Sequence, residues 1–229
     1  MLPGRSLIAT ADTGCDELDL IFARSALELI PESVKDHPQV RSSNRKKDWK
    51  ATVLDSSLHY AGMRKLFEQE RRGRPDIAHF CLLDALESPQ AAKAELNVFL
   101  HCYTDDVLHF KQGTRLPRNQ ERFKGVIGSI LFSKTSSPCI EYLGKQPLYD
   151  FVKKRNSPTL CFSQSGKAST FEKAADIVTD DHIVIVGGFP RGDFSKKELD
   201  SFDAVLSVSD LVMNAWTVSS RFLAAIERM

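Results

Sequence analysis

The stretch Ile183-Val-Ile-Val-Gly-Gly-Phe-Pro-Arg-Gly192 decides how this chain folds. Its first four residues are all apolar, which is typical of a strand covered on both faces in a parallel sheet. Two adjacent glycines follow, and glycine lets the backbone adopt a positive φ or approach a ligand closely. The stretch therefore predicts a central parallel strand that ends in a glycine loop. Its spacing is that of neither a Walker A loop nor a G-x-G-x-x-G fingerprint.

The rest of the C-terminal third has the same alternation of strands and helices, which predicts an α/β fold with a mostly parallel sheet and helices on both faces. Its predicted strands are 159–162, 183–186 and 204–208, and its predicted helices are 147–154, 170–177 and 212–228. In the N-terminal half, alternating apolar residues and turn residues predict strands at 18–22, 52–54, 96–100 and 107–110. The last two of these strands form an inserted hairpin. Helical periodicity predicts helices at 25–35, 58–71, 77–86 and 123–132.

The composition excludes several classes of protein. The 229 residues include 31 Lys and Arg against 30 Asp and Glu, so the formal net charge is +1. A protein that coats nucleic acid with its whole surface is therefore disfavoured, and an anion site must be a local cluster of charge. No apolar run approaches the roughly 20 residues that span a bilayer, so no membrane association is expected.

Five scattered cysteines without a C-x-x-C pair disfavour a disulfide framework, and no histidine lies at metal-ligand spacing from them. We expect no metal, and a reducing cytoplasm as the compartment. Residues 1–17 lack periodicity and carry acidic residues where a secretory signal would be apolar, so they are interpreted as a flexible leader.

Three loops are expected at one edge of the predicted sheet. Ser163–Lys167, Gly187–Gly192 and Ser207–Asp210 each follow a predicted strand. Because the carboxyl ends of parallel strands meet at one edge, the three loops would enclose a crevice, where open α/β folds bind ligands. The glycine loop alone is equally consistent with a tight turn that has no ligand.

Arginines gather in the segment Lys111–Lys124. Pro117 can open a helix, which would place Arg118 and Arg122 on one face with Arg115 just before the first turn. Guanidinium groups bind phosphates in a bidentate manner, so the segment indicates an anion patch suited to RNA or a phosphorylated ligand. The alternative is a solvated helix face.

A second basic segment runs from Arg71 to Asp76. Asp76 could hold Arg74 in position to contact a phosphate or a nucleobase, or it could accept a proton. The alternative is that Asp76 has no ligand-related role, because the helix dipole alone favours a carboxylate in the first turn. His79 and Cys81 are predicted to be core residues. Trp216, Phe222 and Leu223 are predicted to lie in the core of the last helix or in an oligomer interface.

Several motifs occur together in one order: Ser25–Pro31, Leu54–Ser56, His59-Tyr60, Arg72–Ile77, Thr114–Asn119 with Arg122-Phe123, Gly187–Gly192 and Ala215–Thr217. In this combination the chain resembles the archaeal branch of the nucleolar-essential-protein (Nep/Emg) family. These ribosome-biogenesis methyltransferases belong to the SPOUT, or α/β-knot, superfamily. The resemblance runs from about residue 19 to the end of the chain.

The resemblance implies a single α/β-knot domain over 18–229 with a trefoil-knotted, mostly parallel sheet. The knot and cofactor loops would lie at about 159–229 and the RNA-binding elements at about 71–124. The implied activity is S-adenosylmethionine-dependent methylation of N1 of a pseudouridine in a small-subunit (16S) rRNA hairpin loop, together with a role in assembly of that subunit. The implied partners are this rRNA and a second copy of the chain, with ribosomal proteins as further candidates.

The resemblance also assigns site residues by motif position. Arg74, Arg115, Arg118 and Arg122 would bind RNA, with Asp76 orienting Arg74 or, in a second interpretation, serving as a catalytic base. Where relatives often have a Ser-Asn-Tyr-Pro-Leu-like sequence, this chain has Ser209-Asp-Leu-Val-Met213, which leaves main-chain contacts possible but not the same side-chain contacts. The cofactor would be bound by Gly187, Gly192, Val205, Leu206, Ser207, Val208, Ser209 and Asp210.

Two alternatives remain open at this point. A non-catalytic rRNA-binding assembly factor would bind the cofactor without transferring a methyl group. A small-molecule enzyme would use Arg118 for a phosphorylated metabolite and would have negligible affinity for RNA.

Overall fold

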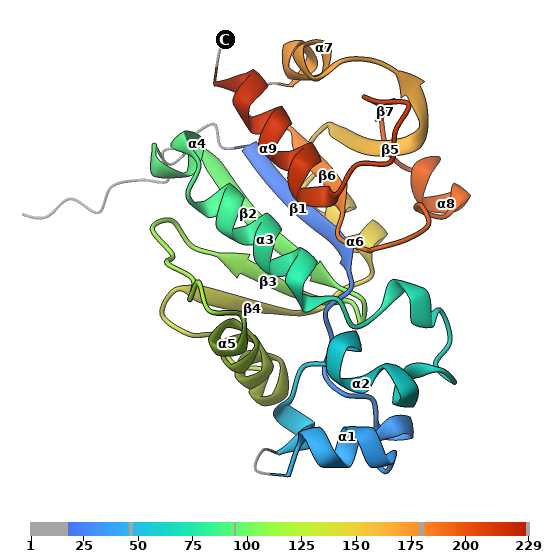
Figure 1. Ribbon diagram of the computed structural model, residues 1–229. Coiled ribbons are helices and arrows are strands. Elements are labelled where there is room, and N and C mark those ends of the chain that lie inside the picture. Colours follow the sequence, from blue (N-terminus) through green and yellow to red (C-terminus); the bar gives the residue numbers. More distant parts are fainter. Residues whose placement is uncertain (1–17, 46–47, 94, 179–180, 228–229) are drawn as a thin grey trace, which may run out of the picture.

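Seven strands form one sheet in the order β4-β3-β2-β1-β6-β5-β7 (Figure 1). The computed structural model describes residues 18–45, 48–93, 95–178 and 181–227, so the expected leader, 1–17, lies outside the described residues. Strands β2, β1, β6, β5 and β7 are parallel, whereas β3 and β4 are antiparallel to their neighbours, as the predicted mostly parallel sheet with an inserted hairpin requires. The strands are β1 (Leu18–Ser25), β2 (Leu96–Cys102), β3 (Asp106–Phe110), β4 (Ile140–Lys145), β5 (Thr159–Ala168), β6 (Ile183–Gly187) and β7 (Ala204–Ser207).

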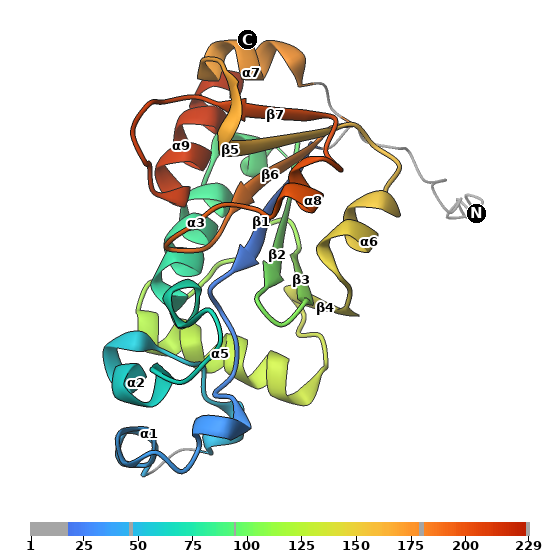
Figure 2. The same cartoon turned by 90° about the vertical axis from the view of Figure 1, so that its right-hand side faces the viewer.

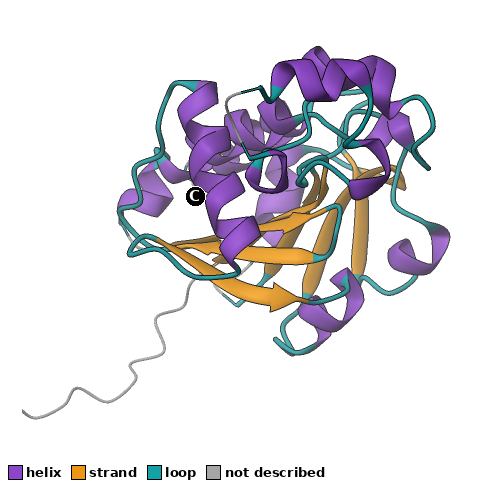
Figure 3. Cartoon of the chain, turned by 90° about the horizontal axis from the view of Figure 1, so that it is seen from below, coloured by secondary structure: helices purple, strands orange, loops and turns teal. Residues whose placement is uncertain are grey.

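Helices cover both faces of the sheet, as predicted (Figures 2 and 3). Side chains alternate along β1, so Leu20 and Phe22 contribute to one buried cluster while Ile21 and Ala23 contribute to the other. The first cluster is covered by α3 (Pro75–Leu86), α5 (Gln120–Ser133), α7 (Phe171–Ile177) and α9 (Ala215–Ile226), with the short α4 (Pro89–Ala92) beside them. The second is covered by α6 (Leu148–Lys153) and by residues flanking and within α8 (Lys196–Leu199).

A small lobe follows β1 and lies beyond its carboxyl end (Figure 1). It contains α1 (Pro38–Ser43), α2 (Ser56–Met63) and single 3₁₀ turns at 32–34, 49–51 and 69–71. Its own apolar cluster consists of Ile30, Val34, Val40, Leu54 and Met63. The buried Lys124 of α5 donates to Asp55, 2.6 Å away, and Asp55 caps α2, so this ion pair connects the lobe to α5.

The structure corrects several local predictions. Residues 25–35 do not form a helix: the Ser25 hydroxyl donates to the Phe22 carbonyl, and Leu29 bridges Val53 in an extended, antiparallel pair. The predicted strand at 52–54 is reduced to this isolated bridge. The predicted helix 58–71 ends at Met63. The sequence interpretation also missed β4, α1, α4 and α8, which are short elements.

The predicted loop 163–167 lies within β5 but interrupts its pairing. Phe162 and Lys167 both pair with Leu206 of β7, so the residues between them bulge out of the ladder. The knot implied by the resemblance stays a prediction, because strand order and register do not define how loops thread. Within the part of the chain that the structure describes, no helix is both long and apolar enough to cross a membrane.

Candidate functional site

The turns after three adjacent strands enclose a cavity of about 660 Å³ at the carboxyl edge of the sheet. Its walls come from 162–165 at the bulge of β5, from 186–194 after β6 and from 206–216 after β7. The convergence of these turns, predicted from the sequence, is confirmed. The volume lies in the usual range for small-molecule sites.

Most of the residues assigned to the cofactor line this cavity. Gly187, Gly192, Leu206, Ser207, Val208 and Ser209 contribute to its walls, whereas Val205 and Asp210 do not. Val205 packs against the apolar cluster that α6 covers, and Asp210 is exposed. Leu211 and Val212 are 76% and 82% exposed at the rim of the cavity.

Glycine is required at two positions of the loop after β6. Gly192 has φ +83°, in the left-handed region that residues with a Cβ avoid. At Gly188 a Cβ would overlap Ser25, because the loop is held against the end of β1. The Gly188 N–H donates to Ala23 and the Gly188 carbonyl accepts from Ala26, at 2.8 and 2.9 Å. The loop backbone is therefore fixed to the centre of the sheet.

Asp193 joins this loop to the bulge of β5. One of its oxygens accepts hydrogen bonds from the hydroxyls of Ser163 and Ser165, at 2.6 and 2.8 Å, and the other accepts from the N–H of Phe194. Burial raises the pKa of the Asp193 carboxyl, but these hydrogen bonds outweigh that effect and hold the pKa below its ordinary value. Asp193 is thus a carboxylate in the cavity wall, and the sequence interpretation did not single it out.

The arginines of the segment 71–76 have three different partners. Arg71 donates to the Asp193 carbonyl at 3.0 Å and stacks over the Phe189 ring, so it holds the glycine loop. Arg72 forms two hydrogen bonds to the buried carboxylate of Glu28. The guanidiniums of Arg71 and Arg72 are therefore used within the protein. The basic segment 71–76 does not by itself show which of its arginines have such partners.

Arg74 and Asp76 form the pair that the sequence predicted. The Arg74 guanidinium donates to both Asp76 oxygens, at 2.8 and 2.6 Å, and this contact raises the pKa of Arg74. The side chain of Arg74 is 39% exposed, so it can still reach a ligand. The next residue, Ile77, lines the cavity, which places the pair beside the cavity. Because both Asp76 oxygens are occupied, its positioning role fits the geometry better than a role as a free base.

The other three arginines lie outside the cavity wall, on the surface around α5. Arg115 and Arg122 line a shallow hollow, and Arg118 pairs with Glu87 at 3.3 Å. The prediction that Pro117 opens a helix and places Arg118 and Arg122 on one face is wrong, because Asn119 caps the helix and α5 begins at Gln120.

The predicted core residues are confirmed. His79 is buried, stacks on Phe123 at 4.3 Å between ring centroids and contacts the Pro117 carbonyl at 2.8 Å. Cys81, Phe222 and Leu223 are also buried. Trp216 differs, because it is only half-buried and lines two hollows.

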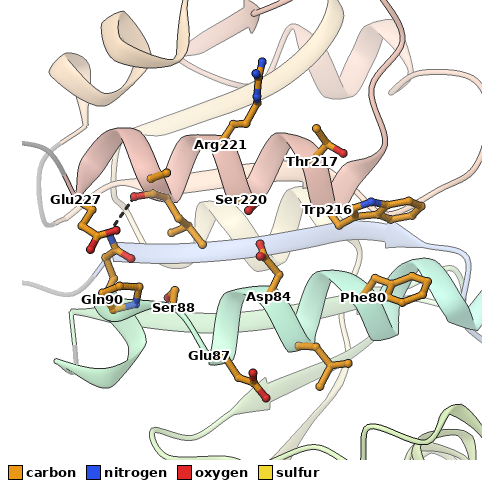
Figure 4. A pocket seen from close by; sticks show the side chains of 14 residues that line it. Phe80, Asp84, Glu87, Ser88, Gln90, Trp216, Thr217, Ser220, Arg221 and Glu227 are labelled. Carbon is orange, nitrogen blue, oxygen red and sulfur yellow. Dashed lines mark hydrogen bonds between the residues drawn. The ribbon is translucent and has the colours of Figure 1, made fainter.

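A second hollow lies between α3 and α9 (Figure 4). Phe80 and Trp216 face each other at one end, with ring centroids 5.4 Å apart, and Phe80 is 52% exposed. Asp84 lies near the middle; burial raises the pKa of its carboxyl although Ser220 donates a hydrogen bond to it. One of its oxygens, Oδ2, is buried without a hydrogen-bond partner among the described residues. This helix face combines exposed aromatic surface with an incompletely satisfied polar group.

Comparison with known proteins gives a consistent result. The model of the EMG1/NEP1 methyltransferase family matches residues 20–227. The ribosomal RNA small subunit methyltransferase Nep1 of Thermococcus kodakarensis is 39% identical, over 92% of this chain and 97% of that protein. The protein of the same name from Staphylothermus marinus is 32% identical, over 93% and 96%. The crystal structure of Archaeoglobus fulgidus Nep1 bound to S-adenosylhomocysteine superposes with a TM-score of 0.81 at 32% identity, over 93% of this chain and 98% of that one.

Proposed function

The chain belongs to the EMG1/NEP1 methyltransferase family, and we propose that it transfers the methyl group of S-adenosylmethionine to RNA of the small ribosomal subunit. The similar proteins of T. kodakarensis and S. marinus are named for this RNA, and the similar A. fulgidus structure holds S-adenosylhomocysteine, which is this cofactor without its methyl group. The observation that carries the proposal is the cavity formed by the turns after β5, β6 and β7.

The cavity fits the methyl donor in size and in chemistry. Phe162, Leu206 and Met213 supply apolar wall for a flat ring system. The backbone of 206–209 and the polar groups of Ser163 and Asp193 supply the few directed contacts that small-molecule sites use. When bound, the cofactor supplies a methyl group that its sulfonium makes electrophilic. The chain then has only to position that group and exclude water.

The target atom we propose is N1 of a pseudouridine in a hairpin loop. A loop nucleotide can be turned out into a pocket, whereas a paired one cannot without unpairing. The N1 proton is weakly acidic and passes to solvent, and the Arg74 guanidinium beside the cavity favours the N1 anion that remains. Asp76 keeps Arg74 in place through its two hydrogen bonds.

The exposed arginines Arg115, Arg118 and Arg122 then bind the phosphates that flank the target nucleotide. They carry no information about the base, since phosphate contacts fix position and register only. Their role is to bring the loop to the surface next to α3, where Arg74 begins the helix.

We also propose that the active form is a homodimer that pairs through the α3–α9 face. The exposed Phe80 and half-buried Trp216 offer the aromatic surface that stable interfaces favour. Ribosomal proteins are further candidate partners. The buried free thiols of Cys81, Cys102 and Cys161 are compatible with the reducing cytoplasm that we propose as the compartment.

The test is mass-spectrometric mapping of methyl groups on two synthetic RNA hairpins that differ only in uridine or pseudouridine at one loop position. We expect one added methyl group, on the pseudouridine hairpin alone, with protein and S-adenosylmethionine present. Binding of both cofactor and RNA without transfer would instead identify a non-catalytic assembly factor. Absence of cofactor binding would refute the proposed function.

A further inference from the structure

Asp193 is a half-buried carboxylate whose charge the protein does not neutralise. Its carboxylate interacts with the hydroxyls of Ser163 and Ser165 and with the backbone N–H groups of Phe194 and Ser165. Among the described residues, no cationic side chain forms an ion pair with it. The other carboxylates around the site differ. Glu28 is paired with Arg72 and Asp76 with Arg74.

The neighbouring arginines leave this charge in place. Arg71 donates to the main-chain carbonyl of Asp193 and stacks on Phe189, so its guanidinium holds the backbone of the loop. Arg191 also lines the cavity, yet it is exposed and forms no ion pair with Asp193 in the described residues. Among the described residues of the cavity wall, Arg191 and Asp193 are the two that carry a full charge.

We propose that Asp193 binds the positive charge of the methyl donor and so makes the cavity selective for a cationic ligand. The inference rests on the proposed function, because it assumes that this cavity holds S-adenosylmethionine. That molecule carries two cations, a sulfonium and an ammonium. A carboxylate that is already ionised and hydrogen-bonded attracts either one without reorganisation, more strongly in a partly buried site than in water.

The hydrogen bonds of Asp193 make it suited to this role. The groups that donate to the carboxylate are hydroxyls and backbone N–H groups, which are all neutral, so they hold it in place without cancelling its charge. Its low pKa keeps it charged throughout the neutral range. The positive φ of Gly192 and the Arg71 contact to the Asp193 carbonyl set the direction of the side chain.

The experiment measures the affinity of the full chain for three ligands by calorimetry. S-adenosylmethionine carries both cations, S-adenosylhomocysteine lacks the sulfonium, and 5′-methylthioadenosine lacks both. In Asp193→Asn we expect affinity for S-adenosylmethionine to fall by about 10- to 100-fold, as loss of a contact between charged groups predicts. An equal fall for S-adenosylhomocysteine identifies the ammonium as the bound cation, and an unchanged affinity for it identifies the sulfonium. Affinity for 5′-methylthioadenosine should stay within about twofold in either case.

The matched control is Asp200→Asn, which removes an exposed carboxylate outside the cavity and should change none of the three affinities. A purely structural role predicts instead that Asp193→Asn lowers all three affinities by one factor, and that result, or no loss at all, would overturn the inference. If Asp193→Asn does not fold, the wild-type protein provides the test. Its preference for S-adenosylmethionine over 5′-methylthioadenosine should shrink as salt is raised, and a preference independent of salt would count against cation recognition. Wild-type protein that binds none of the ligands would refute the proposed function itself.

Discussion

Replacing Arg72 by methionine should destabilise the protein strongly, because it leaves the Glu28 carboxylate buried without a partner. Glu28 is 1% exposed, and Arg72 donates to its two oxygens at 2.6 and 2.7 Å. Removing one member of a buried ion pair costs about 3–5 kcal/mol, and methionine keeps most of the aliphatic packing. For a chain of this size, that loss corresponds to a decrease in melting temperature of about 6–20 °C.

The sign of the pH dependence follows from the same pair. Burial raises the pKa of Glu28 in the folded protein, and Arg72 partly counteracts the increase. Without Arg72 the folded pKa rises further. Between the two pKa values of Glu28, the folded variant keeps the Glu28 carboxyl protonated, whereas the unfolded chain has released that proton. The free energy of unfolding of the variant therefore falls as pH rises from the ordinary pKa of Glu28 to its raised pKa in the folded state. The free-energy deficit of Arg72→Met relative to the wild type should therefore be larger at about pH 8 than at about pH 5.

Urea unfolding followed by circular dichroism at the two pH values measures this deficit. Arg118→Met is the matched control, because the Arg118–Glu87 pair is exposed and its loss should cost less than about 1 kcal/mol. In a Glu28→Gln background, Arg72→Met should cost less than it does alone, since no buried charge is left behind. A deficit no larger than that of Arg118→Met, or one that is equal at both pH values, would refute the reasoning.

Three further predictions concern ligands and assembly. Gly187→Val should lower cofactor affinity at least about tenfold with little effect on RNA affinity. A Cβ at this position lies 2.6 Å from the Phe189 ring, and the valine side chain intrudes on the cavity wall. Retained cofactor affinity in calorimetry would mean that the loop is misassigned. Arg115→Ala and Arg118→Ala should each weaken hairpin RNA binding and reduce the slope of log affinity against log salt concentration by about one unit. Unchanged slopes in both variants would show that these residues do not bind the RNA phosphates. Phe80→Glu should convert a dimer to a monomer in analytical ultracentrifugation, because it places a charge beside Trp216 on the aromatic part of the α3–α9 face. A variant that stays dimeric would exclude this face as the interface.

The parts of the fold that were predictable are those with a strong local signal. The apolar run Ile183–Val186 identified the central strand, and the turn residues between 100 and 107 identified the β2–β3 hairpin. Because parallel strands must end at the same edge, placing three turns after three strands was enough to predict the cavity. His79 was predictable as core because its neighbours in α3 are apolar.

The parts that were missed depend on contacts between distant segments or on competition between local signals. Pro117 and Asn119 are both acceptable near a helix start, and the side chain of Asn119 decides the outcome by accepting from the Arg122 N–H. Strand β4 is an edge strand with half-buried residues and a Gly144 at φ +86°, so its sequence lacks clear alternation. The role of Asp193 depends on Ser163, 30 positions away, which no local pattern contains.

The segment 71–74 shows why counting basic residues overestimates the charge available to RNA. Three arginines lie within four positions, yet the Arg71 guanidinium is used by the loop after β6 and the Arg72 guanidinium by a buried carboxylate. The side chain of Arg74 is 39% exposed, against 10% for Arg72, and Asp76 fixes the direction of Arg74. The other two arginines connect Arg74 to the cavity wall and to the lobe. A protein with almost no net charge can therefore present one cationic group, the Arg74 guanidinium, in a fixed direction at its site, because the neighbouring arginines hold the segment around it in place.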